Sequence, residues 1–410
     1  MVSIIREVLS QRNILVISLT TSLFSVVEMF YRPFWSLYLL ELGASLEVIG
    51  LLSVIQGSSY LILQLPGGFL ADRIGRKKVI VYFTLTNVLA PTVFLWATTW
   101  EQIIPGILIG ALSSVYMPAF NAMISESIPY KRRGAGYGAY RMITQIPWTF
   151  SPLFGGILMD WLGLVYGVRL FLQFMILVTI TITIIRALTL RETLASPAKG
   201  EEKEEGGSSL LAFKQAPRAI YFMLLTGSIS SFGLNLIMPY IVIYARESLK
   251  LSYTEWGLIS MFTGLISMFL AIPGGMLSDR IGRRLSILIG KMMSPLSFLG
   301  LTLSTNFTHV FLSQTISAVG SGFGLGAYGE QGGPAWQSLI ADLIPSKMRA
   351  RIMGMMGTMT GLSGLPSPMI GGYLYNTYSP QTAFIAAASL GIVATVIFGL
   401  TVKEPKEKQV

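Results

Sequence analysis

Long apolar runs separated by short polar connections make up most of the chain. Each run holds about 20 or more mostly apolar residues, which is the length an α-helix needs to cross a lipid bilayer. Such runs occur near residues 13–41, 47–70, 79–98, 102–125, 134–158 and 167–190, and again near 219–245, 254–277, 285–304, 309–341, 352–375 and 381–402. The pattern predicts an all-α membrane protein with twelve transmembrane helices.

One connection differs from the others. The stretch from Ala195 to Ser209 is polar and charged and has no apolar period. Such a composition is typical of a flexible linker. We therefore expect an N-terminal six-helix bundle over residues 1–192, a cytoplasmic linker over 193–214, and a C-terminal six-helix bundle over 215–410.

The composition supports lipid as the main solvent of this chain. Hydrophobic residues make up 52% of the chain and charged residues only 12%, whereas a soluble domain is about 25% charged. The net charge of +10 does not indicate nucleic-acid binding, because nearly all Lys and Arg lie in short connections between apolar runs. Their bias toward alternate connections predicts that both termini are cytoplasmic, in a multi-pass protein of the cell membrane.

Several chemistries are excluded by what the chain lacks. It has no cysteine and a single histidine, His309, which falls in a predicted loop. Thiolate and histidine-ligated metal sites are therefore not expected. We also find no Ser/His/Asp set and no nucleotide-binding P-loop. The sequence thus predicts no metal, no cofactor, no enzymatic activity and no direct use of ATP.

The two halves of the chain repeat one another. The segment from Pro66 to Lys77 recurs from Pro273 to Arg284 at an offset of 207 residues. Further along, Glu126-Ser-Ile-Pro and Ser-Pro-Leu-Phe-Gly-Gly recur at an offset of 216. Both copies begin and end on the same side of the membrane, so they are parallel repeats. Parallel six-helix halves are found in transporters whose substrate binds near the bilayer midplane.

The repeated loop resembles that of the major facilitator superfamily, and a segment of helix 5 resembles one found in the twelve-helix drug:proton antiporter branch of that family. The resemblance covers essentially the whole chain. It implies two pseudo-symmetric bundles, alternating access by rocking, and a charge network that closes the cytoplasmic side. We expect a monomer. The expected gate residues are Gly68, Asp72, Arg73, Gly75, Arg76, Glu126, Arg133, Asp279, Arg280, Arg283, Asp342 and Arg349.

Helix 5 carries Ser-Pro-x-x-Gly-Gly, which resembles the Gly-Pro-x-x-Gly-Gly segment of the antiporter branch with Ser in place of the first Gly. Its copy in helix 11 instead favours a general device for bending and close packing of helices. Both interpretations stay open. The residues concerned are Pro152, Gly155, Gly156, Pro368, Gly371 and Gly372.

Charges inside the predicted spans are the main functional candidates, because a charge at the bilayer centre costs about 2.5–3.5 kcal/mol on insertion scales. Glu28 and Arg32 are four residues apart and share a helix face. They form either a structural pair or a proton carrier with its electrostatic partner. Tyr31 and Trp35 lie on an aromatic face that either packs in the core or lines a substrate cavity. Further candidates are Arg141, Lys291 and Glu330.

Helix 10 holds nine more residues than helix 4, since the repeat offset rises from 207 to 216 within it. The extra residues fall in a glycine-dense segment, Gly320–Pro334, and glycine disfavours a continuous helix. A break here would place Glu330 and Gln331 at the cavity or the outer gate. The alternative is a shifted register with a longer outer loop.

The sequence therefore predicts a secondary active transporter with a small-molecule substrate, protons as coupling ion and the bilayer as surroundings. The first hypothesis is proton-coupled export of amphipathic, drug-like compounds. The alternative is proton-coupled uptake of a small organic anion or sugar, because Arg32, Arg141 and Lys291 outnumber the acidic residues inside the spans. A non-transporting sensor on the same fold is a more remote alternative.

Overall fold

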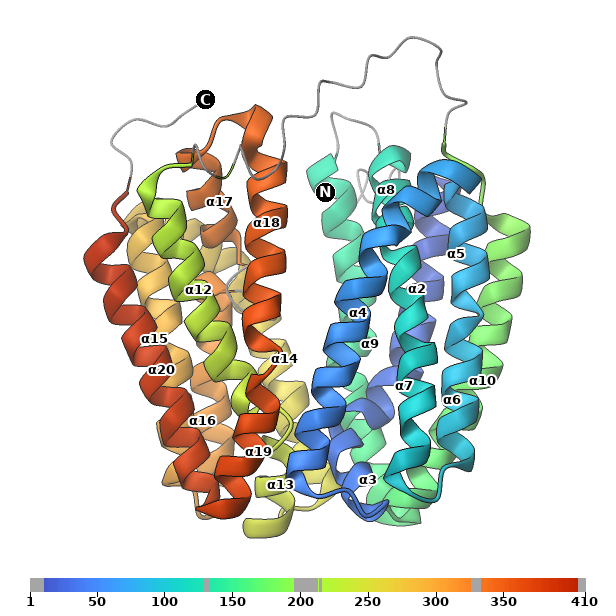
Figure 1. The fold of residues 1–410 in the computed structure, drawn as a ribbon, viewed down its shortest axis with the longest axis horizontal. Coiled ribbons are helices and arrows are strands. Elements are labelled where there is room, and N and C mark those ends of the chain that lie inside the picture. The colour runs from blue at the N-terminus through green and yellow to red at the C-terminus, as the bar shows by residue number, and fades with distance from the viewer. Residues whose placement is uncertain (1–10, 129–132, 195–212, 214–215, 326–332, 405–410) are drawn as a thin grey trace. The chain divides into compact units, whose positions relative to one another are not determined.

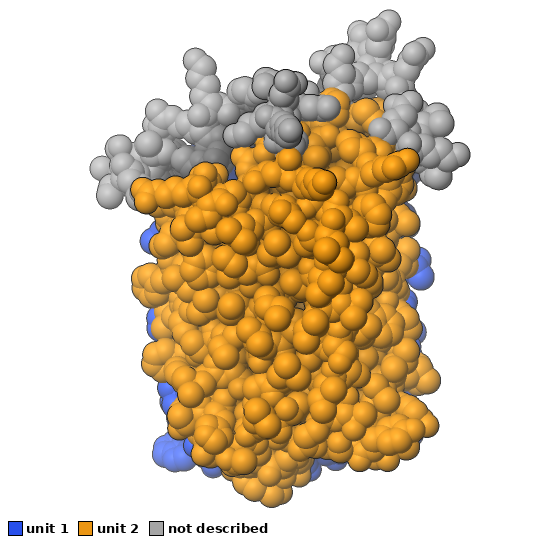
Figure 2. All heavy atoms as spheres, turned by 90° about the vertical axis from the view of Figure 1, so that its left-hand side faces the viewer, with its two compact units in different colours: residues 1–44, 55–201, 252–258 blue, residues 45–54, 202–251, 259–410 orange. Residues whose placement is uncertain are grey.

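The computed structural model describes residues 11–128, 133–194, 213, 216–325 and 333–404. The chain forms two compact units (Figure 2). Unit 1 consists of residues 1–44, 55–201 and 252–258, and unit 2 of residues 45–54, 202–251 and 259–410. Of the predicted linker, only Thr193, Leu194 and Phe213 lie within the described residues.

Unit 1 is a bundle of helices that follow one another up and down (Figure 1). Several of the predicted spans consist of two consecutive helical segments. Its main helices are α2 (Arg12–Tyr31), α3 (Trp35–Glu41), α4 (Leu46–Ile74), α5 (Arg76–Thr84), α6 (Thr86–Trp96), α7 (Ile103–Ala111), α8 (Met117–Ser127), α9 (Arg133–Leu162) and α10 (Leu164–Thr189).

Unit 2 repeats this order. Its main helices are α12 (Arg218–Ile237), α13 (Ile241–Ile243), α14 (Tyr253–Ile281), α15 (Arg283–Thr302), α16 (Phe307–Gly320), α17 (Pro334–Leu343), α18 (Ser346–Gly364), α19 (Ser367–Thr377) and α20 (Pro380–Thr401). Two helices are shared. The first turns of α4 belong to unit 2, and the first turns of α14 belong to unit 1.

Within the described residues, nine helical stretches are long and apolar enough to cross a membrane. The other three predicted spans correspond to α9, to α16 with α17, and to α18 with α19. The twelve-helix architecture predicted from the apolar runs is therefore confirmed.

Proline and glycine fix where helices break. Pro33 follows α2 in a 3₁₀ turn, Arg32–Phe34, because its ring and missing N–H disrupt the helical ladder. Gly75 joins α4 to α5 with a φ of 100°, and Gly282 joins α14 to α15 with a φ of 93°. Glycine adopts such angles without steric cost. We call the end of each unit that carries this loop the loop end, and the opposite end the distal end.

The core of each unit is apolar, and so is much of its outside. A cluster with Ile80, Ala119 and Phe120 fills unit 1, and one with Trp336 and Phe398 fills unit 2. Large apolar side chains are also widely exposed, for example Leu188 at 74%. Such a surface suits lipid contact rather than water.

Helix 10 is irregular where the extra residues fall. After α16, a π-helical turn covers Ser321–Leu325, and α17 begins at Pro334. The equivalent part of unit 1 is also irregular, with a 3₁₀ stretch at Leu112–Tyr116. Residues 326–332, with Glu330 and Gln331, lie outside the described residues, so the proposed break and its cavity role stay predictions.

Candidate functional site

Glu28 and Arg32 form an ion pair one turn apart at the end of α2. The Glu28 side chain is 16% exposed and the Arg32 side chain 56%. The spacing of Glu28 and Arg32 places them on one helix face, and in the structure the two charges are paired. The arginine is the more accessible of the two.

The aromatic run of helix 1 is packed inside unit 1. Phe34 and Tyr38 are fully buried. The Trp35 ring lies 6.0 Å from Tyr31, 5.4 Å from Tyr38 and 5.0 Å from Phe94 of α6, between ring centroids. These contacts are those of a packed core. A role of Tyr31 and Trp35 in substrate stacking stays a prediction.

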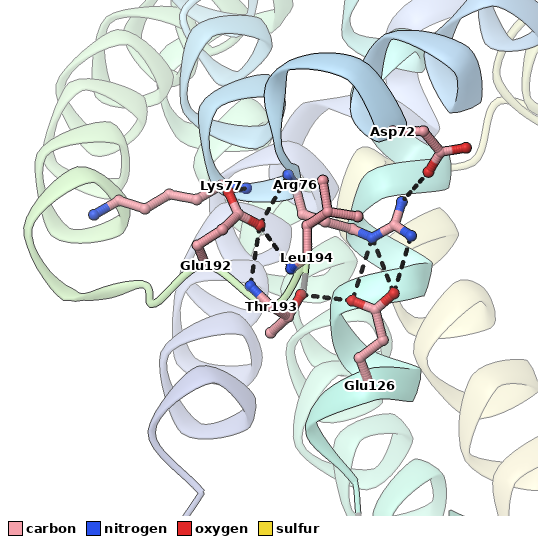
Figure 3. A network of polar contacts seen from close by, with 7 residues as sticks. All are labelled: Asp72, Arg76, Lys77, Glu126, Glu192, Thr193 and Leu194. Carbon is pink, nitrogen blue, oxygen red and sulfur yellow. Dashed lines mark hydrogen bonds and ion pairs between the residues drawn. The ribbon is translucent and has the colours of Figure 1, made fainter. Parts of the chain in front are cut away.

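A charge network gathers at the loop end of unit 1 (Figure 3). Arg76 of α5 lies at its centre, with Nη1 3.0 Å from Asp72 Oδ1 and Nη2 3.0 Å from Glu126 Oε1. Thr193 donates a hydrogen bond of 2.6 Å to the other oxygen of Glu126. The network therefore ties α4, α5, α8 and the segment after α10 together within unit 1.

Arg73, Arg133 and Gly68 are also predicted to belong to the gate of unit 1. Arg73 lies over the ring of Phe69, 5.4 Å from its centroid. The side chain of Arg133 lies outside the described residues. If Gly68 carried a Cβ atom, the nearest neighbouring atom would lie 3.7 Å from it. A Cβ on the adjacent Gly67 would lie only 2.2 Å from the carbonyl oxygen of Val115. The close helix crossing is therefore made by Gly67.

Glu192 is a central residue that sequence reasoning missed. Its carboxylate accepts hydrogen bonds from the backbone N–H groups of Arg76 at 3.0 Å and Lys77 at 3.2 Å. These are the first N–H groups of α5, which have no partner within the helix. A Cβ on Gly75 would lie 2.5 Å from this carboxylate. Gly75 is thus needed both for its backbone angle and for the space it leaves.

The same arrangement recurs at the loop end of unit 2. Glu404 accepts a hydrogen bond from the backbone N–H of Arg283, and a Cβ on Gly282 would lie 2.7 Å from its carboxylate. Arg283 pairs with Asp342. An offset of 212 residues relates Glu192 to Glu404, and this third offset of the repeat could have revealed both residues.

The remaining predicted gate residues of unit 2 have other surroundings. Asp279 and Arg280 are exposed. The Arg349 guanidinium donates a hydrogen bond of 2.7 Å to the carbonyl oxygen of Ala341 in the last turn of α17. A cation is favourable at a helix C-terminus, so the contacts of Arg349 stabilise α17.

Each unit also buries one cation within its bundle. Arg186 of α10 is 4% exposed and donates hydrogen bonds to the hydroxyls of Thr20 at 3.1 Å and Thr84 at 3.0 Å. Its guanidinium lies over the rings of Tyr116 and Phe120, 6.0 and 5.4 Å from their centroids. Aromatic faces attract cations, so hydroxyls and rings together accommodate this charge.

Lys291 of α15 occupies the matching place in unit 2. It is 3% exposed and donates a hydrogen bond of 3.0 Å to Ser230. Its ammonium lies 5.8 Å from the Trp336 ring and 5.6 Å from the Phe398 ring. These contacts lie within unit 2, so Lys291 belongs to the core of its bundle.

The repeat offsets show that the two cation sites are equivalent but are filled from opposite helices. At an offset of 207, Thr84 corresponds to Lys291, and at an offset of 212, Arg186 corresponds to Phe398. The cation thus comes from the sixth helix of unit 1 and from the third helix of unit 2. Both units thus accommodate one buried cation at this place in the bundle.

The other predicted cavity and packing residues are placed as follows. Arg141 is exposed on α9, two turns from its start. A Cβ on Gly155 of α9 would lie 2.0 Å from the carbonyl oxygen of Phe30, and one on Gly371 of α19 would lie 1.7 Å from that of Leu236. Both glycines therefore allow direct backbone contact with the first helix of their half. Pro152 lies inside the continuous helix α9, and Pro368 lies in the first turn of α19.

Comparisons with known proteins agree with this architecture. The family model of the Major Facilitator Superfamily matches residues 17–329 and 223–410. An uncharacterised MFS-type transporter of Methanocaldococcus jannaschii is 24% identical over 395 residues, which cover 96% of this chain and 99% of that protein. The solved structure of the nucleoside transporter NupG covers 96% of this chain and 99% of its own, with a TM-score of 0.76 and 13% identity.

A shorter match is to a resistance protein. The quinolone resistance protein NorA of Staphylococcus aureus is 28% identical over 175 residues, which cover 43% of this chain and 42% of NorA. The similarity thus extends over less than half of either protein.

Proposed function

Because the chain belongs to the Major Facilitator Superfamily and is a membrane transporter rather than an enzyme, we propose that it exports amphipathic small molecules in exchange for protons. The similarity to NorA, whose name refers to quinolone resistance, supports this choice of substrate class. Coupling to protons is proposed because a carboxylate within a span can take up and release one at each side of the membrane.

The observation that carries this proposal is the Glu28–Arg32 pair in α2. A charge near the bilayer centre is costly and marks a functional site by default. A proton on Glu28 cancels its charge and frees Arg32 from the pair. A cationic substrate competes with the proton for the same carboxylate. Exclusive binding of one or the other is what antiport requires.

The proposed cycle uses the repeat. We propose that the bundles of residues 1–192 and 215–410 rock about the substrate site, with both termini in the cytoplasm. The basic loops at Arg73 and Arg280 then face the anionic inner leaflet of the cell membrane. The network around Arg76, whose contacts lie within unit 1, holds the loop end of that bundle in shape, and the other bundle closes the cytoplasmic side against it in one state.

The test is proton release from inverted vesicles that hold a pH gradient. A panel of lipophilic cations is added to vesicles with the wild-type protein, with Glu28→Gln or with Glu41→Gln. Glu41 is an exposed glutamate at the end of α3 and serves as the matched control. We expect several cations to release protons from the wild type and the control, and at least tenfold slower release for Glu28→Gln.

Two outcomes would contradict the proposal. If Glu28→Gln releases protons as fast as the control, Glu28 is not the carrier. If no cation releases protons from wild-type vesicles that contain folded protein, export of lipophilic cations is refuted.

Uptake of a small organic anion is the second candidate, and one observation favours it. The exposed member of the pair is Arg32, at 56%, rather than Glu28, at 16%. Arg141 is exposed as well. An arginine fork binds carboxylates well. Saturable, proton-driven uptake of one polar anion, lost in Arg32→Gln and kept in Arg73→Gln, would establish this alternative.

A further inference from the structure

Helices α5 and α10 of unit 1 pack against each other and run in opposite directions. Two contacts fix how they are aligned. Arg186 of α10 donates a hydrogen bond of 3.0 Å to Thr84 of α5. Glu192, just after α10, accepts one of 3.2 Å from the backbone N–H of Lys77. The start of α5 and the end of α10 therefore lie side by side at the loop end of unit 1.

Both helices expose apolar side chains along one face. The exposed residues follow one another at intervals of three or four, so they form a stripe on each helix. We call these two rows the apolar stripes of unit 1. The first consists of Tyr82, Leu85 and Leu89 on α5 and α6, and the second of Ile180, Ile184 and Leu188 on α10. Exposed apolar surface of this extent indicates contact with lipid.

A cation stands at the loop end of each stripe. Lys78 precedes Tyr82 by one turn, and Arg191 follows Leu188 by three residues; both cations are exposed. The backbone of Arg191 is held in place by Asn13. The Arg191 N–H donates a hydrogen bond of 2.9 Å to the side chain of Asn13, and the Arg191 carbonyl accepts one of 3.0 Å from it. Both cations thus lie where the apolar surface ends, the position that suits a long basic side chain at a membrane interface.

Unit 2 has equivalent apolar stripes. At an offset of 212, Leu188 and Ile184 correspond to Leu400 and Val396. Leu188 is 74% exposed and Leu400 76%, while Ile184 and Val396 are both 53% exposed. On the third helix of unit 2, the exposed row is Leu285, Met292 and Leu296. The repeat therefore builds the same apolar surface in both halves.

The two units differ at the loop end of these stripes. Lys78 corresponds to Leu285 at an offset of 207, whereas Arg191 corresponds to another cation, Lys403, at an offset of 212. Unit 1 thus carries two cations at this place and unit 2 carries one. Tyr82, whose phenol suits the interface, is likewise replaced by an isoleucine in unit 2. Since unit 2 packs the same helices with a leucine in place of Lys78, packing alone does not explain the lysine.

A glycerophospholipid with an anionic headgroup matches the features that distinguish unit 1. Its phosphate lies at the interface and its two acyl chains extend into the bilayer. A guanidinium binds phosphate through two parallel hydrogen bonds, and an ammonium binds it as a point charge. The phenol of Tyr82 lies between the charged and the apolar part of the surface, as the glycerol backbone of such a lipid does.

We infer that α5 and α10 of unit 1 form a binding site for one anionic phospholipid. Its phosphate lies between Lys78 and Arg191, and its acyl chains lie along the two apolar stripes. Every residue of this site belongs to unit 1, and none belongs to the Glu28–Arg32 pair. The site needs neither a transported substrate nor a coupling ion, so it goes beyond the proposed export function.

The test is native mass spectrometry of the full chain in detergent, with equal amounts of phosphatidylglycerol and phosphatidylcholine that carry the same acyl chains. The wild type should retain one phosphatidylglycerol in preference to phosphatidylcholine. A Lys or Arg near an anionic surface strengthens binding by about fivefold. We therefore expect Lys78→Leu to lower the ratio of retained phosphatidylglycerol to phosphatidylcholine about fivefold, and Lys78→Leu with Arg191→Leu to lower it roughly 25-fold.

The halves supply a gain of binding and a matched control. Leu285→Lys gives unit 2 a second cation beside Lys403 and should add one retained phosphatidylglycerol. Arg280→Gln removes an exposed cation at the loop end of unit 2, but from α14, which carries neither stripe. It should keep the wild-type ratio. Lys78→Gln removes the charge with a smaller change in side-chain shape and provides the result if Lys78→Leu fails to fold.

Three outcomes would overturn the inference. The first is a wild-type protein without preference for phosphatidylglycerol, and the second is an unchanged ratio in both Lys78→Leu and Lys78→Gln. The third is an equal drop in Arg280→Gln, because the preference would then reflect overall charge. Inorganic phosphate, added as a competitor, should not displace the lipid; full displacement would show an anion site to which the chains contribute nothing, and would overturn the inference too.

This experiment and the vesicle assay fail independently of each other. The lipid measurement uses neither a substrate nor a proton gradient, and its variants leave Glu28 and Arg32 unchanged. Loss of the lipid preference would leave the export proposal untouched. A vesicle assay without proton release would leave the lipid site untouched.

Discussion

Replacing Gly274 with alanine should destabilise unit 2, whereas the same change at its neighbour Gly275 should not. A Cβ on Gly274 would lie 2.0 Å from the carbonyl oxygen of Gly322, while a Cβ on Gly275 would have nothing within 4 Å. Both glycines lie in α14. The two substitutions therefore change helix propensity equally and lie at nearly the same depth in the membrane. They differ only in the contact that the new methyl group makes.

The expected magnitude follows from this geometry. Real Cβ atoms stay beyond 3.0 Å, and the contact involves backbone on both sides, so no side chain can rotate away. The two segments must separate by roughly 1 Å, and overpacking of this kind costs about 1–3 kcal/mol. Alanine in a helix interior is about 1 kcal/mol better than glycine, and this gain alone acts at Gly275. The direct contact cost therefore lowers the free energy of unfolding of Gly274→Ala by about 1–3 kcal/mol relative to Gly275→Ala.

Thermal unfolding in detergent, followed by tryptophan fluorescence, measures the difference. For a chain of this length, the melting temperatures of the two variants should differ by roughly 1–4 °C. The same contrast is expected in unit 1 between Gly67→Ala and Gly68→Ala, whose built Cβ atoms lie 2.2 and 3.7 Å from their nearest neighbours. Equal melting temperatures within both pairs would refute the reasoning.

Two further predictions concern the buried cations and the loop ends. Arg186→Phe removes two hydrogen bonds to a charged group, each worth about 1.5–3 kcal/mol, and should lower the melting temperature. Adding Thr84→Lys rebuilds the arrangement of unit 2 and should recover much of the loss, whereas Thr84→Lys alone places two cations in one site and should destabilise. Glu192→Gln weakens the cap of α5, so hydrogen exchange of the peptide that begins at Arg76 should become severalfold faster. The matching peptide capped by Glu404 should not change, and equal acceleration of both would contradict a local cap.

The sequence was sufficient for the architecture because lipid imposes it. A helix must be about 20 apolar residues long to cross the bilayer, and this length is visible without any contact between helices. The internal repeat is likewise visible in the sequence alone, and it predicts that the two halves are equivalent. The sequence did not predict where the first span divides into α2 and α3, because Pro33 acts locally within an otherwise continuous apolar run.

The candidate site was predictable only where contacts are local or repeated. Glu28 and Arg32 are one turn apart, so their spacing alone brings them together. Glu192 lies 116 residues from Arg76, and its cap depends on how α10 ends beside α5. A cavity role for Lys291 was left open, because hydropathy reports depth in the membrane but not the direction in which a side chain points.

Comparison of the halves separates what the fold needs from what it does not. Arg186 and Lys291 fill equivalent sites from different helices, so a buried cation there serves packing in both halves. The ion pair of α2 has no such counterpart. At the offset of 206 that relates Thr20 to Thr226, Glu28 and Arg32 correspond to Leu234 and Met238.

Unit 2 therefore builds the equivalent helix, with the equivalent glycine contact at Leu236, with apolar residues at these two positions. Packing does not require the pair, and two charges within a span oppose insertion. A structural role is thus the weaker explanation of Glu28 and Arg32, and a role in coupling the stronger one. Glu28→Gln should therefore fold and insert normally while losing proton release. A loss of folding in Glu28→Gln and Glu28→Leu alike would show that unit 1, unlike unit 2, does depend on the pair.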